Sequence, residues 1–234
     1  ATVLSLLGDR WLQPGIYNKL ARWYWCGVLG ELYGGAGETR MALDLQDLMQ
    51  WIDGSDQEPT TIRDANFQPG RLETLRSRTS AAYKGINVLV QRQGAKDFFW
   101  NSTIRDLDET DWEERKLDIH HIFPRKWCED KRIPPGRYNS ILNKTPISYK
   151  ANRMIGGNAP STYLKQLQQH EHVQLNDVEM DAILETHCIT PTLLRANDFE
   201  GFITTRKRTL LTKIEAVMGK AIVLSDEAVP EDEP

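Results

Sequence analysis

Two short apolar runs, residues 117–124 and 141–148, interrupt a chain whose other apolar positions repeat mainly at helical spacing. Each run has the length of a strand, and Pro124 closes the first one. Residues 149–154 then follow a serine that can cap a helix, and the glycine pair 156–157 ends them. The sequence therefore predicts a strand, a loop, a second strand and a short helix, in that order.

The rest of the chain is predicted to be helical, because apolar residues recur three and four positions apart and Gly or Pro marks the breaks. We expect helices near residues 15–32, 41–52, 72–92, 178–187 and 199–218, and one that starts at 160–164. Gly94 is the predicted stop of the third helix. The expected fold class is α+β, predominantly α-helical, with helical flanks around the small strand-strand-helix unit.

The pattern divides the chain into four regions. They are a helical region at 1–110, the strand-strand-helix motif at 111–165, a C-terminal helical region that packs on the motif at 166–222, and an acidic, disordered tail at 223–234. The chain begins with Ala1 rather than Met and opens directly into apolar sequence. We therefore expect it to be a piece of a longer protein.

The excess acidic charge lies at the C-terminal end of the chain. The formal net charge is −4, but the last fourteen residues hold five acidic residues and no basic one. The first 220 residues therefore carry 29 basic and 28 acidic side chains, a net charge of +1. Because Lys and Arg make most contacts to DNA phosphates, a DNA-binding surface on this chain must be a local patch.

The sequence carries no export or membrane signal. No run approaches the roughly 18 consecutive apolar residues of a membrane helix, and the first residues lack the basic, apolar and small-residue order of a signal peptide. Cys26, Cys128 and Cys188 are odd in number and far apart, which argues against a disulfide framework. We expect a cytoplasmic protein in a reducing compartment, without a membrane partner.

Four side chains in and after the two apolar runs carry groups suited to phosphodiester hydrolysis. This reaction needs an activated water, neutralisation of charge on the phosphate oxygens and help for the departing alkoxide. A neutral imidazole accepts a proton near pH 7, and imidazole, carboxylate and amide groups bind divalent ions. His120, His121, Asn143 and Asn152 supply such groups within 33 residues.

Three segments, DIHHIFP at 118–124, ILNKTPIS at 141–148 and YKANRMIGG at 149–157, together resemble the ββα-metal motif of HNH nucleases. More narrowly, they resemble the C-terminal nuclease domain of GmrSD-like restriction proteins of bacteria. The flanks are similar to that family at RWYWC (22–26), YGG (33–35), GAKDF (94–98) and PSTYL (160–164). The resemblance thus covers most of the chain.

This resemblance implies a divalent-metal-dependent endonuclease that nicks or cuts DNA as the effector domain of a bacterial restriction or phage-defence protein. In the family a ParB-like, nucleotide-hydrolysing domain usually precedes the nuclease. The implied partners are therefore DNA and such a domain of the full-length protein, and assembly into a homo-oligomer is left open.

Carried over position by position, the resemblance makes His120 a metal ligand and His121 the general base. Asn143 matches the central asparagine, which orients the base or steadies the loop. Asn152 matches the closing metal ligand on the helix. Two such ligands hold an ion loosely, which favours Mg²⁺ or Mn²⁺ over Zn²⁺.

Other charged side chains near the motif have open interpretations. Asp118 shares a strand face with His120, and is a partner for an imidazole, an additional ligand or a strand-edge charge. Arg153 adjoins Asn152 and is a candidate to grip the scissile phosphate. The remaining candidates for a basic patch, as opposed to ordinary solvated charges, are Lys144, Lys150, Arg125 and Lys126.

The other histidines have plainer interpretations. We interpret His170 and His172 as a polar helix end rather than as metal ligands, and His187-Cys188 as a buried helix terminus. Two alternatives to an active nuclease stay open. One is a nucleic-acid-binding or modification-sensing module without catalysis, and the other is a structural zinc site formed by the histidines and Cys128.

Overall fold

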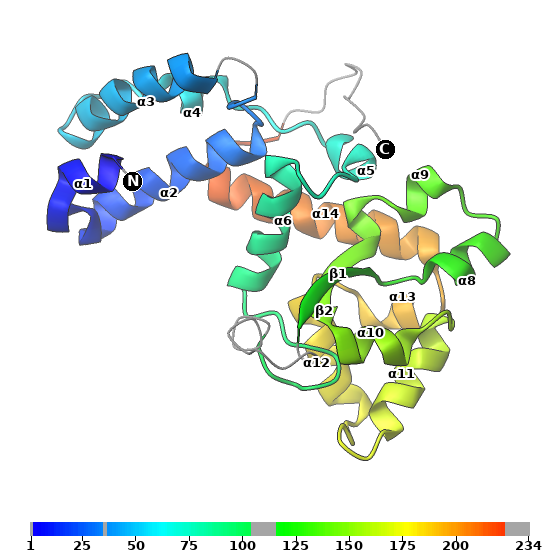
Figure 1. Cartoon of the computed structure of the whole chain (residues 1–234). Helices are drawn as coiled ribbons and strands as arrows, with labels where there is room; N and C mark the ends of the chain where they lie inside the picture. Colours follow the sequence, from blue (N-terminus) through cyan, green and yellow to red (C-terminus); the bar gives the residue numbers. More distant parts are fainter. Residues whose placement is uncertain (1, 35–36, 104–115, 223–234) are drawn as a thin grey trace. The chain divides into compact units, whose positions relative to one another are not determined.

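The computed structural model describes residues 2–34, 37–103 and 116–222, which form two compact units. Unit 1 contains the residues described among 1–69, 79–85 and 211–228, and unit 2 contains those among 70–78 and 86–210. Helices predominate, and the described residues include one antiparallel pair of strands (Figure 1). The predicted fold class, a predominantly helical α+β protein, is confirmed.

Helices make up unit 1, and the strands belong to unit 2. The elements of unit 1 are α1 (Thr2–Leu7), η1 (Gly8–Leu12), α2 (Pro14–Leu29), α3 (Gly37–Ile52) and α4 (Thr60–Asp64). Those of unit 2 are α5 (Arg71–Thr74), β1 (Leu117–His121), α8 (Arg125–Asp130), α9 (Pro135–Tyr138), η3 (Ile141–Asn143), β2 (Lys144–Ser148), α10 (Tyr149–Ile155), α11 (Pro160–Gln169), α12 (Asp177–Thr186) and α13 (Pro191–Arg195). Two helices, α6 (Ala81–Arg92) and α14 (Phe199–Met218), contribute residues to both units.

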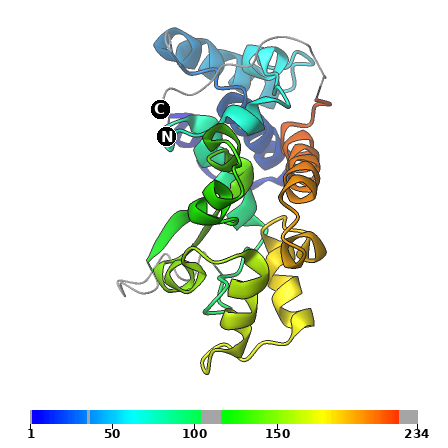
Figure 2. The ribbon, with the colours of Figure 1, turned by 90° about the vertical axis from the view of Figure 1, so that its right-hand side faces the viewer.

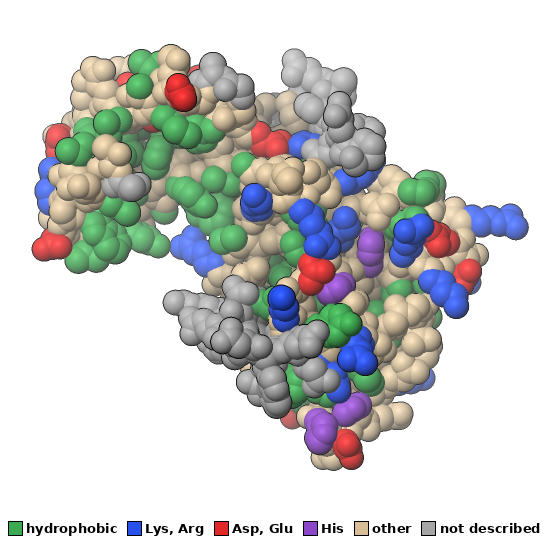
Figure 3. Space-filling view, in the orientation of Figure 1, with side chains coloured by type: hydrophobic (Ala, Val, Ile, Leu, Met, Phe, Trp, Pro, Cys, Tyr) green, Lys and Arg blue, Asp and Glu red, His purple; other side chains and the backbone are tan. Residues whose placement is uncertain are grey.

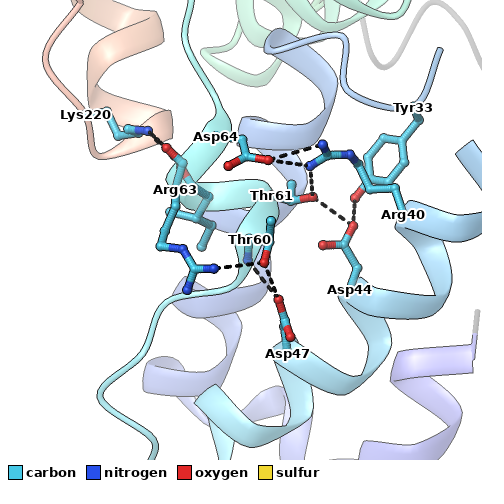
Figure 4. A network of polar contacts seen from close by, with 10 residues as sticks. Tyr33, Arg40, Asp44, Asp47, Thr60, Thr61, Arg63, Asp64 and Lys220 are labelled. Carbon is cyan, nitrogen blue, oxygen red and sulfur yellow. Dashed lines mark hydrogen bonds and ion pairs between the residues drawn. The ribbon is translucent and has the colours of Figure 1, made fainter. Parts of the chain in front are cut away.

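Polar side chains connect α3 with its neighbours in unit 1 (Figure 4). The carboxylate of Asp44, which is buried in α3, accepts hydrogen bonds from the hydroxyls of Tyr33 and Thr61. One turn earlier in α3, Arg40 pairs with Asp64 at 3.2 Å. The buried carboxylate therefore has hydroxyl partners that offset the cost of removing it from water.

The C-terminal residues of unit 1 are also held by hydrogen bonds. Lys220 Nζ donates to three carbonyls at the end of α4, at 2.6 to 3.0 Å, where a positive charge is favourable because the carbonyls of the last helical turn point outward. Arg22 of α2 donates to the carbonyl of Met218 at 3.1 Å. These contacts fix the end of α14 against α2 and α4.

The prediction of one helix over 72–92 is wrong. Leu75 leaves the helical conformation, with ψ at 105°, and its carbonyl accepts the N–H of Ile141 at 2.9 Å. The next helix, α6, starts later, where the hydroxyl of Ser80 accepts the N–H of Tyr83 at 3.3 Å. A hydrogen bond between distant residues and a local serine contact thus divide a segment whose apolar periodicity is continuous.

Both predicted strands are present, although each is shorter than its apolar run, and they pair with each other. In the antiparallel register His120 lies opposite Thr145, and His121 is the last residue of β1. The second run begins with the 3₁₀ turn η3. Arg206, which is buried in α14, donates hydrogen bonds to two backbone carbonyls of this run. Arg206 Nη1 donates to Leu142 at 2.7 Å and to Lys144 at 2.9 Å.

Asp97, which is fully buried, fixes the junction between β2 and α10. Its carboxylate accepts the N–H of Ser148 at 2.6 Å and the hydroxyl of the same serine at 3.0 Å. Ser148 Oγ in turn accepts the N–H of Ala151 at 3.1 Å, which is the predicted cap of α10. Gly156 ends the helix with a φ of +53°, a conformation that favours glycine.

The core of unit 2 lies around the residues that follow β1 and around the later helices. The ring of Phe123 is 5.1 to 5.3 Å from those of Trp127, Phe199 and Phe202, measured between ring centroids. Figures 1 and 2 both place α11, α12 and the turn between them together at one end of unit 2. His187, which is fully buried, packs edge-on against the ring of Phe98, with 5.0 Å between ring centroids.

His187 is a structural residue, as predicted for a buried helix terminus. It follows the last residue of α12, and its Nε2 donates to the carbonyl of Lys96 at 2.7 Å. The hydroxyl of Thr145, on β2, lies 2.7 Å from its Nδ1 and donates to it when the ring is neutral. Burial lowers the pKa of His187 to about 4. The neutral ring therefore links Thr145, on β2, to the backbone at Lys96.

Two predictions lie outside the described residues. They are the boundary at 110 and 111 and the acidic tail at 223–234. The motif predicted at 111–165 and the helices after it share unit 2 up to residue 210. In the described ranges no helix combines the length and the apolar character needed to cross a bilayer.

We predict that His187 makes the stability of this protein fall between pH 6.5 and pH 4. In this window the unfolded chain binds a proton at His187 and the folded chain does not. The free energy of unfolding therefore decreases by up to about 3 kcal/mol as the pH falls from 6.5 to 4. Urea unfolding at several pH values measures this effect. The difference in free energy of unfolding between wild type and His187→Asn should become smaller towards pH 4. The prediction would be contradicted if this difference were the same at every pH.

Candidate active site

A pocket of about 430 Å³ in unit 2 is lined by the histidine pair at the end of β1 and by residues of α10. Its lining includes five of the predicted site residues: His120, His121, Arg125, Lys126 and Asn152. Glu129 of α8 and the backbone of Gly156 and Gly157 complete much of the wall. The other five predicted residues, Asp118, Asn143, Lys144, Lys150 and Arg153, do not line this pocket.

His120 presents a buried nitrogen without a hydrogen bond. Its side chain is 17% exposed, and Nε2 makes no hydrogen bond with any residue that the structure describes. Its nearest acidic atom is Asp118 Oδ2, at 3.8 Å, which exceeds hydrogen-bond distance. Burial lowers the pKa of His120, and this effect outweighs the nearby carboxylate. A neutral imidazole with a free nitrogen is the form that binds a metal ion.

Asp118 lies on the same strand face as His120, as predicted. An arginine from a distant segment holds its carboxylate there. Arg78 Nη1 pairs with Asp118 Oδ1 at 2.6 Å, and Arg78 Nη2 donates to the carbonyl of Ile119 at 2.9 Å. The carboxylate is about half exposed, so this ion pair orients Asp118 more than it stabilises the fold. Its other oxygen is the atom that faces His120.

His121 is held from the loop between the strands. Its Nε2 lies 3.0 Å from Oδ1 of Asn139, and its ring packs edge-on against Tyr138 at 6.0 Å between centroids. Burial lowers the pKa of His121, and the Asn139 contact opposes that shift. The positive charge of Lys144 lowers the pKa further. The ring is therefore neutral near pH 7 and able to accept a proton.

Asn143 fixes the loop between the strands through its side-chain hydrogen bonds, none of which involves His121. The residue is fully buried, its Oδ1 accepts the N–H of Phe123 at 2.8 Å, and its Nδ2 donates to the carbonyls of Phe123 at 2.9 Å and Tyr138 at 3.0 Å. Its own carbonyl accepts the N–H of Ile122 at 2.8 Å. These hydrogen bonds join the residues after β1 to Tyr138 and Asn143 at the far side of the loop.

Asn152 is placed differently from Asn143. It lies on α10, is partly exposed and lines the same pocket as His120. Its side-chain amide makes no hydrogen bond with the part of the chain that the structure describes. The residue with an unused amide and the residue with an unused, buried imidazole nitrogen thus line one pocket.

The predicted basic residues differ in their surroundings. Figure 3 shows Lys and Arg side chains gathered beside histidines on this face of unit 2. Arg125 and Lys126 are exposed at the pocket, although Arg125 also pairs with Glu129 at 2.7 Å. Lys126 lies against Gly157, where a Cβ would come within 3.0 Å of it. The pocket therefore has a basic rim that is partly neutralised by one carboxylate.

Three other predicted basic residues lie outside the pocket. The guanidinium of Arg153 lies 5.5 Å from the ring centre of Tyr149, and the ammonium of Lys150 lies 5.3 Å from that of Phe99. Burial lowers the pKa of Lys144. All three residues belong to β2 or α10, and none of them lines the pocket.

The remaining candidate ligands are accounted for. His170 follows the last residue of α11, in the predicted polar helix end, and its Nδ1 accepts the N–H of His172 at 3.2 Å. Cys128 is buried, its thiol lies 3.5 Å from the carbonyl of Phe123, and burial raises its pKa to about 12. Among the described residues no three His, Cys, Asp or Glu side chains are grouped to hold one ion. The structural zinc site would need ligands beyond this set.

Asn139 and Arg78 are the residues that sequence reasoning missed. Asn139 lies 18 positions from the histidine that it contacts, and Arg78 lies 40 positions from Asp118. No local pattern in the sequence indicates either pair. The only available signal was the position of Asn139 in the polar loop between the two predicted strands.

A protein of known sequence is similar to most of this chain. The chain is 28% identical to "Uncharacterized protein MJ0686" of Methanocaldococcus jannaschii over 220 residues, which cover 84% of this chain and 37% of that protein. The chain therefore spans well under half of its relative's length. No family profile and no solved structure matches the chain. The relative's name assigns no activity.

We predict that the two asparagines differ in their contribution to stability. Asn143→Ala should lower the free energy of unfolding by about 3 kcal/mol, because three buried backbone groups lose their partner. Asn152→Ala should change it by less than about 0.5 kcal/mol, because its amide makes no hydrogen bond in the described structure. Urea unfolding of both variants measures the difference. Equal destabilisation by the two substitutions would contradict these roles.

Proposed function

We propose that unit 2 carries an HNH-type endonuclease site that hydrolyses phosphodiester bonds in DNA with the help of a divalent ion. The observation that supports this proposal most is the shared pocket of His120, His121 and Asn152. Their order on strand, loop, strand and helix is that of the ββα-metal motif, which the sequence resembles. The free Nε2 of His120 and the free amide of Asn152 fit the requirements of a metal site.

In this proposal His120 and Asn152 would hold the ion, and two such loosely binding ligands favour Mg²⁺ or Mn²⁺. A bound divalent ion neutralises charge on the phosphate and on the leaving oxygen. Asp118, at 3.8 Å from His120, adds negative charge beside that ligand. These residues set the position of the phosphate relative to the base.

His121 acts as the general base. Its neutral ring takes a proton from water as the water oxygen attacks phosphorus in line with the leaving group. The new bond joins water oxygen to phosphorus, and the bond from phosphorus to the 3′ oxygen breaks. The departing 3′ oxygen takes a proton from solvent, so the products are a 5′ phosphate and a 3′ hydroxyl, and one site of this kind cuts one strand.

DNA reaches the pocket over the basic side chains around it. Arg125 and Lys126 are exposed at the rim, and Arg153 and Lys150 lie on α10, which also carries Asn152. Such contacts are made to phosphates and carry little sequence information. We propose that target choice belongs to another part of a longer restriction or phage-defence protein, such as a ParB-like domain.

A binding module without catalysis is the second candidate function. The observation that favours it is the small number of strong ligands, since no group of three His, Cys, Asp or Glu occurs in the described ranges. In that case the basic rim would bind nucleic acid and the histidines would contribute to recognition. Cleavage and binding assays on the same variants distinguish the two functions.

We predict that the purified protein nicks supercoiled plasmid DNA in the presence of Mg²⁺ or Mn²⁺. His121→Ala should abolish nicking, because the base is lost, while DNA affinity is kept. His172→Ala is the matched control, since His172 is exposed and does not line the pocket. Gel electrophoresis of the plasmid measures the conversion to nicked circles. Equal nicking by His121→Ala would overturn the assignment of the base.

We also predict that His120→Ala and Asn152→Ala weaken Mn²⁺ binding by at least about tenfold, because each removes a ligand. His121→Ala should bind Mn²⁺ almost as wild type does. Isothermal titration calorimetry measures the affinities without any need for activity. Unchanged binding in both ligand variants would place the ion elsewhere, and stoichiometric binding of zinc that resists chelators would favour the structural alternative.

A further inference from the structure

Asn139 contacts the proposed base from outside the pocket. It follows the last residue of α9, in the loop between the strands, and its Oδ1 lies 3.0 Å from Nε2 of His121. His121 lines the pocket, whereas Asn139 does not. The asparagine is therefore placed to hold the ring without occupying the space that the substrate needs.

The backbone that carries Asn139 is fixed on both sides. Its own N–H donates to the carbonyl of Pro135 at 3.0 Å, and the hydroxyl of Ser140 donates to the carbonyl of Arg137 at 2.9 Å. The carbonyl of Tyr138, directly before Asn139, accepts from Nδ2 of the buried Asn143 at 3.0 Å. The side chain of Asn139 thus extends from a support that cannot shift easily.

We propose that Asn139 is a positioning residue for His121, whose amide oxygen accepts the Nε2 proton, fixes the plane of the ring and leaves Nδ1 as the nitrogen that receives the proton from water. The two asparagines then act in series. Asn143 fixes the loop, and the loop presents Asn139 to the base. This inference rests on the proposed endonuclease function for its catalytic consequence, but the contact itself is testable without catalysis.

His121 needs a positioning residue because an imidazole ring rotates about its χ angles unless a second contact holds it. The ring of Tyr138 packs against one edge of His121, and that contact alone does not select a tautomer. A hydrogen bond to one ring nitrogen defines which nitrogen carries the proton and which is basic. For histidines that bind metals, loss of such a supporting contact typically lowers metal affinity or activity by about 10- to 100-fold, and we expect an effect of the same order for a base.

A pair of substitutions separates the hydrogen bond from the packing. Asn139→Leu keeps the volume and removes the acceptor, whereas Asn139→Asp keeps an acceptor oxygen in place. In the plasmid assay with Mn²⁺, we expect Asn139→Leu to lower kcat by about 10- to 100-fold with KM unchanged. Asn139→Asp should restore most of kcat. The control is Asn18→Leu, on the exposed surface of α2 in unit 1.

A spectroscopic measurement tests the contact in the metal-free protein. In ¹⁵N-labelled wild type, the Nε2 proton of His121 should be protected from exchange and visible, and its nitrogen shifts should report the Nε2–H tautomer. The signal should be lost in Asn139→Leu and kept in Asn139→Asp and in Asn18→Leu. A wild type that never cleaves DNA would refute the proposed function and leave this spectrum to be judged separately.

Two results would overturn the inference. One is an Asn139→Leu protein that keeps both the wild-type kcat and the protected Nε2 proton. The other is an Asn139→Asp protein that is as impaired as Asn139→Leu, because the role would then depend on the amide group rather than on an acceptor. Thermal unfolding of each variant identifies a loss of kcat that comes from unfolding.

Discussion

The hydrogen bonds of one buried amide, Asn143, support the whole candidate site. Its side chain bridges Phe123, just after β1, and Tyr138, at the end of α9, so both ends of the inter-strand loop are fixed by a single residue. Each buried partner would lose a hydrogen bond without it, at a cost of about 1 to 3 kcal/mol per group. The histidine pair can therefore keep its place at the end of a strand only five residues long.

Two further buried polar groups extend this support. Arg206 donates to the carbonyls on either side of Asn143, and Asp97 binds both the backbone and the hydroxyl of Ser148 at the start of α10. A two-stranded sheet is marginally stable alone in water. Here its loop is held by Arg206 and its exit helix by Asp97, so segments remote in the sequence stabilise the small strand pair.

The site combines rigid supports with unused ligand groups. Nε2 of His120 is buried without a hydrogen bond. His187, which contacts Thr145 on the strand opposite His120, has both ring nitrogens hydrogen-bonded. A buried polar atom without a partner is costly in a folded protein, and a bound ion is one of the explanations for such an atom. The contrast between the two histidines supports a binding role for His120 and a structural role for His187.

The sequence by itself determined the order of strand, loop, strand and short helix, the cap at Ser148 and the candidates His120, His121 and Asn152, because these depend on local periodicity and short motifs. Only the tertiary structure decided that Asn143 holds the loop and that Asn139 holds His121. It also divided the predicted helix at 72–92, because Leu75 pairs with Ile141. Such contacts join residues far apart in the chain, and hydrogen bonds of this kind leave no periodic signal in the sequence.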